Sequence, residues 1–107
     1  GWFGTKIKVQ VPPDVREDKF GEALRAIGDK DLATLSDPPV RKDGHPITAA
    51  ELLSTPPIAR AGGYLFGYAD ATTGEVTPVK TKSGRAFVLD WAALAPEIKK
   101  RVPGAFR

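Results

Sequence analysis

Residues 64–89, YLFGYADATTGEVTPVKTKSGRAFVL, contain three short strand-like runs separated by two turns. The runs are residues 64–68, 76–81 and 85–89, and they are rich in the aromatic and β-branched residues that favour strands. Each connecting segment contains a glycine and small polar residues, which is typical of tight reversals of the chain. The C-terminal half is therefore predicted to form a three-stranded antiparallel meander.

A further strand is predicted near the N-terminus, over Thr5–Val11. Its apolar residues Ile7, Val9 and Val11 alternate with lysine and glutamine, the pattern of a strand with one face in water. Pro12-Pro13 follows and should end the strand, because proline has no backbone N–H to donate. The expected sheet is small and mainly antiparallel, made of this N-terminal strand and the C-terminal meander.

Helices are expected between these strands. Asp14 and Glu17 have the spacing of a capping box before an apolar period of helical type, which predicts a helix over residues 15–27. Residues 29–35 should add one more turn. A second capping box, Thr48-Ala-Ala-Glu51, predicts a short helix that ends near Leu53, before Pro56-Pro57.

The C-terminal residues predict two more helical segments. Asp90 is placed to cap a turn that carries Trp91 and Leu94, and Pro96 suits the first position of a last helix through Val102. Residues 36–46, which contain three prolines and a run of charges, are expected to be a loop. Together the patterns predict an α+β fold of two to four short helices packed with the small sheet, in a single domain spanning residues 1–107.

Composition excludes several kinds of chemistry. The chain has no cysteine and a single histidine, His45, so a disulfide framework, a cysteine-ligated metal, a thiol nucleophile and a two-histidine metal site are all excluded. No apolar stretch approaches the ~20 residues of a membrane span, and we expect a soluble chain without a membrane partner. We also expect no cofactor and no metal ion. The compartment is left open by these features.

His45 is the only candidate for general acid–base chemistry near neutral pH. It lies in a charged loop, with Asp37, Asp43, Ser36 and Thr48 nearby in the sequence, but their spacing singles out no partner. A hydrolase or nuclease centred on His45 is a minor alternative. We expect no enzymatic activity and name no catalytic residue.

Aromatic residues at the ends of the chain and on one predicted strand suggest a docking surface. Aromatic side chains contribute much contact area at protein interfaces and lose little rotamer freedom there. An exposed aromatic at the end of a small domain is unfavourable unless the core or a partner covers it. The predicted partner-binding residues are Trp2, Phe3, Tyr64, Tyr68 and Phe106.

Basic residues suggest an alternative partner, a nucleic acid. Residues 1–53 carry eight basic and nine acidic side chains, whereas residues 54–107 carry eight and four. The basic hairpin of the second half resembles the wing of winged-helix DNA-binding domains, although prolines and glycines stand where a recognition helix should follow Leu53. The residues predicted for this alternative are Lys80, Lys82, Arg85, Lys99, Lys100 and Arg101.

The sequence thus predicts a non-catalytic module that works by protein–protein contact, as a subunit of an assembly, an adaptor or an inhibitor. Accessory proteins of virus particles are one class that fits this outline. A weak nucleic-acid-binding domain is the alternative. The partner and the oligomeric state are not indicated by any residue pattern.

Overall fold

The computed structural model describes residues 9–107 of the chain. Four α-helices and several small antiparallel sheets make up this part, which confirms the predicted α+β class. The helices are α1 (Phe20–Arg25), α2 (Asp29–Ala33), α3 (Ala49–Leu52) and α4 (Trp91–Arg101), with 3₁₀ turns η2 (Glu17–Lys19) and η3 (Pro103–Ala105). The strands are β1 (Pro39–Val40), β2 (Ile58–Arg60), β3 (Gly63–Leu65), β4 (Gly67–Ala69), β5 (Val76–Pro78), β6 (Lys80–Thr81) and β7 (Val88–Leu89).

The three strand-like runs of the predicted meander are present and antiparallel, but each run is interrupted by a buried residue. Strands β3 and β4 meet at Phe66, β5 and β6 meet at Val79, and Phe87 precedes β7. The N–H of Val79 donates to the carbonyl of Phe66 at 3.0 Å, and the N–H of Phe87 donates to the carbonyl of Val79 at 2.7 Å. These three residues therefore join the runs at a single buried junction.

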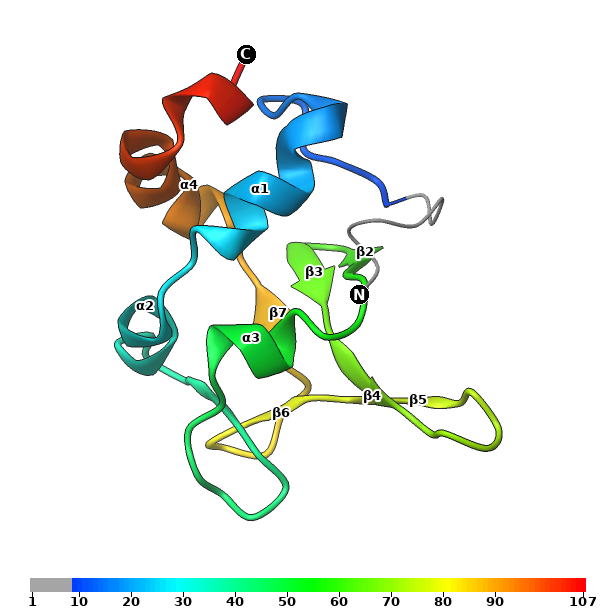
Figure 1. Ribbon diagram of the computed structural model, residues 1–107. Coiled ribbons are helices and arrows are strands. Elements are labelled where there is room, and N and C mark those ends of the chain that lie inside the picture. The colour runs from blue at the N-terminus through cyan, green and yellow to red at the C-terminus, as the bar shows by residue number, and fades with distance from the viewer. Residues whose placement is uncertain (1–8) are drawn as a thin grey trace.

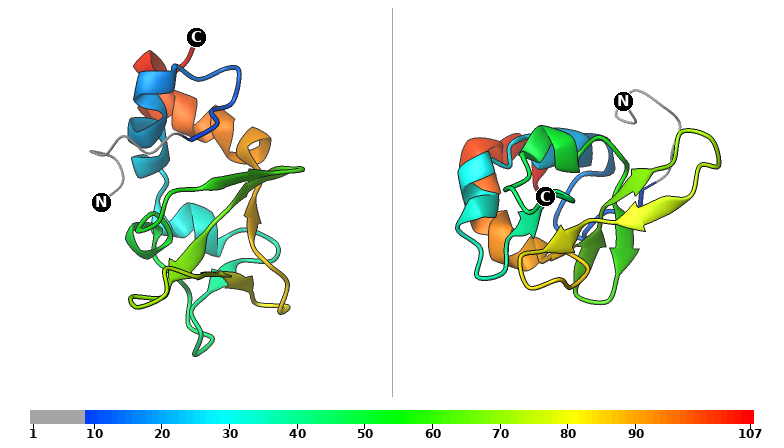
Figure 2. Two further views of the ribbon diagram at one scale, coloured as in Figure 1. Left: turned by 90° about the vertical axis from the view of Figure 1, so that its right-hand side faces the viewer. Right: turned by 90° about the horizontal axis from the view of Figure 1, so that it is seen from below.

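Beyond this junction the runs separate and pair with different neighbours. Strand β4 pairs with β5, with Tyr68 opposite Thr77, whereas β3 pairs with β2 and with β7. Strand β6 pairs with β1, with Val40 opposite Lys80. As a result the β4–β5 hairpin projects away from the helices, as Figures 1 and 2 show. The sheet is consequently divided into two-stranded and three-stranded pieces rather than a single layer.

The predicted N-terminal strand is not supported over the residues that the structure describes. Residues 9–11 form no strand, and residues 5–8 lie outside the described part. Val9 and Val11 nevertheless pack against the core, and the carbonyl of Gln10 accepts a hydrogen bond from the Tyr64 hydroxyl at 2.7 Å. Residues 9–11 thus cover the core without forming a strand.

The first predicted helix begins later than expected. Residues 14–16 pair instead with the C-terminus: Val15 bridges to Phe106, and the N–H of Arg107 donates to the carbonyl of Asp14 at 2.9 Å. The Asp14 carboxylate caps no helix and accepts from Trp91 Nε1 at 3.3 Å. The prediction that Asp14 caps a helix from residue 15 was therefore wrong, because a tertiary contact uses both its backbone and its side chain.

The second capping box is confirmed. Thr48 Oγ1 accepts from the N–H of Glu51 at 3.2 Å, and Glu51 Oε1 accepts from the N–H of Thr48 at 3.2 Å. Helix α4 differs in two ways from the prediction: it is continuous from Trp91 to Arg101 with Pro96 inside it, and the Asp90 side chain makes no capping bond. The two predicted C-terminal segments are thus one helix.

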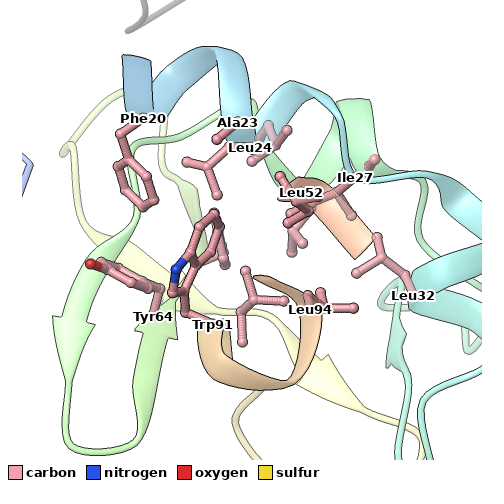
Figure 3. Packing of buried hydrophobic residues seen from close by; sticks show 14 of the residues in the cluster. Phe20, Ala23, Leu24, Ile27, Leu32, Leu52, Tyr64, Trp91 and Leu94 are labelled. Carbon is pink, nitrogen blue, oxygen red and sulfur yellow. The ribbon is translucent and has the colours of Figure 1, made fainter. Parts of the chain in front are cut away.

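One apolar core joins the helices to the sheet pieces. Its centre is aromatic: the Phe20 ring lies 5.2 Å from that of Tyr64 and 5.4 Å from that of Trp91, and Trp91 stacks on Phe106 at 6.0 Å. Figure 3 shows the rings of Phe20, Tyr64 and Trp91 close together, with the labelled leucines beside them. Contact between α1 and α4, side by side in Figure 1, closes the core on the helical side.

Candidate functional site

Two of the five aromatic residues predicted to bind a partner belong to the core. Tyr64 and Phe106 are 6% and 8% exposed, and each contacts another core ring. Trp2 and Phe3 lie outside the described residues. Tyr68 is the member of the predicted set that the structure places at the surface, where it is half-buried on the β4–β5 hairpin.

Tyr68 has a covered hydroxyl and a ring that faces a cation. Lys42 Nζ lies over the ring, 5.1 Å from its centre, which is within the range of a cation–π contact. The hydroxyl is buried and has no hydrogen-bond partner among the described residues. Burial raises the pKa of Tyr68, and the charges of Glu51, Arg41 and Asp43 also act on it. The Tyr68 phenol group therefore lies within electrostatic range of Arg41 and Glu51.

A short loop brings these charges beside Tyr68. The pairing of β1 with β6 holds the start of the loop, and the N–H of Arg41 donates to the carbonyl of His45 at 2.7 Å to close it. Arg41 Nε and Nη2 donate to the Glu51 carboxylate at 2.8–3.1 Å. With the Thr48 donors, this pair lowers the pKa of Glu51 to about 2. Both partners are therefore ionised near neutral pH.

Two depressions share Tyr68, Arg41 and Lys42 but differ in charge. The first, the Tyr68 pocket, has a volume of about 80 Å³ and is lined by Val40, Arg41, Lys42, Tyr68, Thr77, Pro78 and Lys80. The second is broader, about 360 Å³, and also contains the Glu51 and Asp43 carboxylates. The lining of the Tyr68 pocket is therefore cationic and apolar, except for the hydroxyls of Tyr68 and Thr77. The second depression instead contains equal numbers of cationic and anionic side chains.

The basic residues predicted to contact nucleic acid fall into two separate groups. Lys80, Lys82 and Arg85 are exposed on and after β6, and Lys80 lines the Tyr68 pocket. The others, Lys99, Lys100 and Arg101, lie at the far end of α4, on the opposite side of the molecule in Figure 1. The two groups therefore do not form one basic surface.

Arg101 and Lys100 are also engaged in contacts of their own. Arg101 donates to Asp31 at 2.6 and 3.1 Å and to the carbonyl of Ala26 at 3.0 Å, which ties α4 to the start of α2. Lys100 pairs with Glu97 at 3.2 Å. Arg41 and Lys42, which the sequence placed in a solvated turn, are instead the basic residues that the fold brings to Lys80. Their position beside Lys80 follows from the pairing of β1 with β6, which no local sequence pattern indicates.

His45 is not part of a recognisable catalytic arrangement. Its side chain is 73% exposed, and its Nδ1 lies 3.1 Å from Asp43 Oδ2. The same aspartate accepts from the His45 N–H at 3.0 Å, so this contact serves the turn of the loop. Among residues 9–107, no group of three histidine and carboxylate side chains is arranged to hold a metal ion.

A third depression, a groove of about 380 Å³, lies between β7, the start of α4 and the segment after α2. Leu35, Phe87, Leu89 and Leu94 contribute apolar lining, and Asp37, Arg85 and Asp90 contribute charges of both signs. Asp37 is held at the edge by Ser83, whose N–H and hydroxyl donate to it at 3.0 and 2.6 Å. With two carboxylates and one guanidinium, the lining of this groove has charges of both signs and carries no excess of positive charge.

Comparisons with protein-family models, with curated proteins and with solved structures give no match to this chain. Within the part of the chain that the structure describes, no helix is long and apolar enough to cross a membrane. Only the geometry of the site therefore bears on the function of this chain.

Proposed function

We propose that this chain is a non-catalytic binding module that contacts a protein partner through the surface around Tyr68. The observation that carries the proposal is the Tyr68 pocket: an apolar concavity bordered by cations, next to a half-buried aromatic ring. Aromatic rings and arginine side chains at the centre of a concave patch are typical of the residues that dominate protein interfaces.

The position of the pocket supports this role. It lies at the base of the projecting β4–β5 hairpin, and the β1–β6 pairing supplies its other wall. Its side chains come from short elements joined to the core through Val79 and Phe66, so the pocket is held in place by buried backbone hydrogen bonds. A preformed site of this kind binds with less loss of conformational freedom than a mobile loop.

The proposal is tested by affinity capture from a nuclease-treated extract of the source, with the intact chain immobilised. We expect a bound protein that is lost when Lys42 and Lys80 are both changed to glutamate. The matched control changes Lys30 and Lys99 to glutamate, which alters the net charge equally on α2 and α4, away from the pocket. Capture that survives the first pair of changes, or that is lost equally with the second, would contradict the proposal.

Nucleic acid binding is the second candidate function. It is favoured by Lys80, Lys82 and Arg85, which are exposed together and make no ion pair within the described residues. The expected signature is retention of single-stranded or duplex DNA that falls steeply with salt. Charge reversal at Lys80 and Lys82 should abolish it, and the absence of retention at low salt excludes this function.

A further inference from the structure

We propose that the Tyr68 pocket receives one aliphatic side chain of an acidic protein segment, whose carboxylates pair with Lys42 and Lys80. This inference rests on the proposed function and names the chemistry of the partner. It follows from the size of the pocket, from the apolar character of its walls and from the charges at its border.

The size of the pocket limits the anchoring group. An apolar cavity of about 150 Å³ binds a benzene ring, and the Tyr68 pocket has about 80 Å³. The branched end of a leucine or valine side chain suits this smaller space better than an indole, which is larger than benzene. The walls suit such a group, because Val40, Pro78 and the Tyr68 ring are apolar.

The charges select an acidic segment around the anchor. Lys42 and Lys80 line the pocket, and neither forms an ion pair with another described residue. Arg41 also lines it, but the Glu51 carboxylate already occupies its guanidinium. The carboxylates Glu51 and Asp43 lie in the neighbouring depression. Hydrogen bonds from Thr73 and Thr72 lower the pKa of Asp70, and the charge of Lys42 adds a smaller effect. The two lysines are therefore the groups left to meet an incoming anion.

The apolar walls favour a protein over a nucleic acid. A nucleic acid would present phosphates and flat bases, and base binding to a protein surface uses stacking on exposed aromatic faces. Here Lys42 lies over one face of the Tyr68 ring, and the ring itself is half-buried against its own hairpin. An aliphatic group flanked by carboxylates would contact both the apolar walls and the two lysines of the pocket, whereas a phosphate would contact only the lysines.

The test is a titration of the isotopically labelled chain, followed by backbone amide shifts. The probe is the blocked peptide Glu-Glu-Leu-Glu-Glu. Three further peptides replace the central leucine by serine, replace it by tryptophan, or replace all four glutamates by lysine. We expect saturable shifts for the first peptide at the pocket residues that have an amide, which are Val40, Arg41, Lys42, Tyr68, Thr77 and Lys80.

The controls separate anchoring from general attraction of charge. The serine and tryptophan peptides should bind at least about tenfold more weakly, because the first lacks the apolar group and the second exceeds the space. Changing Lys42 and Lys80 together to glutamine should weaken binding about fivefold or more and remove most of its salt dependence. Changing Lys30 and Lys99 together to glutamine should leave the binding of the leucine peptide unaltered.

Three outcomes would overturn the inference. Equal binding of the serine and leucine peptides would show attraction of charge without an anchor. Shifts of the same amides by an oligothymidylate at lower concentration than by the leucine peptide would assign the surface to nucleic acid. If the capture experiment succeeds while no acidic peptide shifts the pocket amides, the protein-binding function stands and this choice of ligand is wrong.

Discussion

Arg41 holds both carboxylate oxygens of Glu51, with Nε at 3.1 and 2.9 Å from Oε1 and Oε2, and with Nη2 at 2.8 Å from Oε1. The same carboxylate accepts the N–H of Thr48 and so closes the capping box of α3. The Glu51 side chain thus links the loop after β1 to the start of α3. It also fixes the guanidinium that borders the Tyr68 pocket.

This arrangement predicts how the loop responds to acid. Because the pKa of Glu51 is lowered to about 2, its contribution to stability is complete above the pKa of about 4.3 in the unfolded chain. That contribution is lost progressively as the pH falls from about 4.3 through about 2. A carboxyl-carbon NMR titration of Glu51 should show this low midpoint. In Arg41→Gln the midpoint should rise but stay below the usual range, since the Thr48 donors remain; an unshifted midpoint would refute the assignment.

The buried junction of the meander should dominate stability. Phe66 is fully buried and accepts the N–H of Val79 where β3 passes into β4. Phe66→Ala removes most of a large core side chain and should cost about 3–5 kcal/mol of unfolding free energy. That is a large part of the roughly 5–15 kcal/mol typical of a domain. Urea unfolding measures it, with the exposed Val76→Ala as a control that should change stability little.

Gly63 is required by a close approach of two strands. A Cβ at this position would collide with the carbonyl of Leu89, the residue after which β7 ends, and its φ of +152° is also rare for other residues. Gly63→Ala should therefore separate β3 from β7 and destabilise the fold by about 3 kcal/mol. Gly44→Ala is the matched control: its φ is +90° but its surroundings are open, so about 1 kcal/mol is expected. Equal losses in thermal unfolding would contradict the steric explanation.

The two tyrosines should respond in opposite ways to removal of their hydroxyls. The Tyr68 hydroxyl is buried without a partner among the described residues, so Tyr68→Phe should leave stability unchanged or raise it by up to about 1 kcal/mol. The Tyr64 hydroxyl donates to Gln10, so Tyr64→Phe should lower stability by about 1 kcal/mol. Chemical unfolding of both variants tests the pair, and a destabilised Tyr68→Phe would point to a hydrogen bond at that hydroxyl.

Local sequence patterns predicted an element correctly where its hydrogen bonds join residues that are close in the sequence. The Thr48 and Glu51 capping box was confirmed because both of its bonds lie within four residues. The same spacing at Asp14 and Glu17 failed. There the backbone pairs with residues at the other end of the chain, and the Asp14 carboxylate meets Trp91. A local pattern cannot show that a distant residue competes for the same atoms.

The sequence by itself determined the α+β class, the positions of the turns and the absence of cysteine chemistry, because these follow from composition and from short-range backbone preferences. Tertiary structure alone decided which residues reach the surface together. It placed Tyr64 and Phe106 in the core and left Tyr68 at the hairpin. The pairing of Val40 with Lys80, forty residues apart, brought Arg41 and Lys42 to the Tyr68 pocket. Such contacts depend on strand pairing over long separations, which no local pattern encodes.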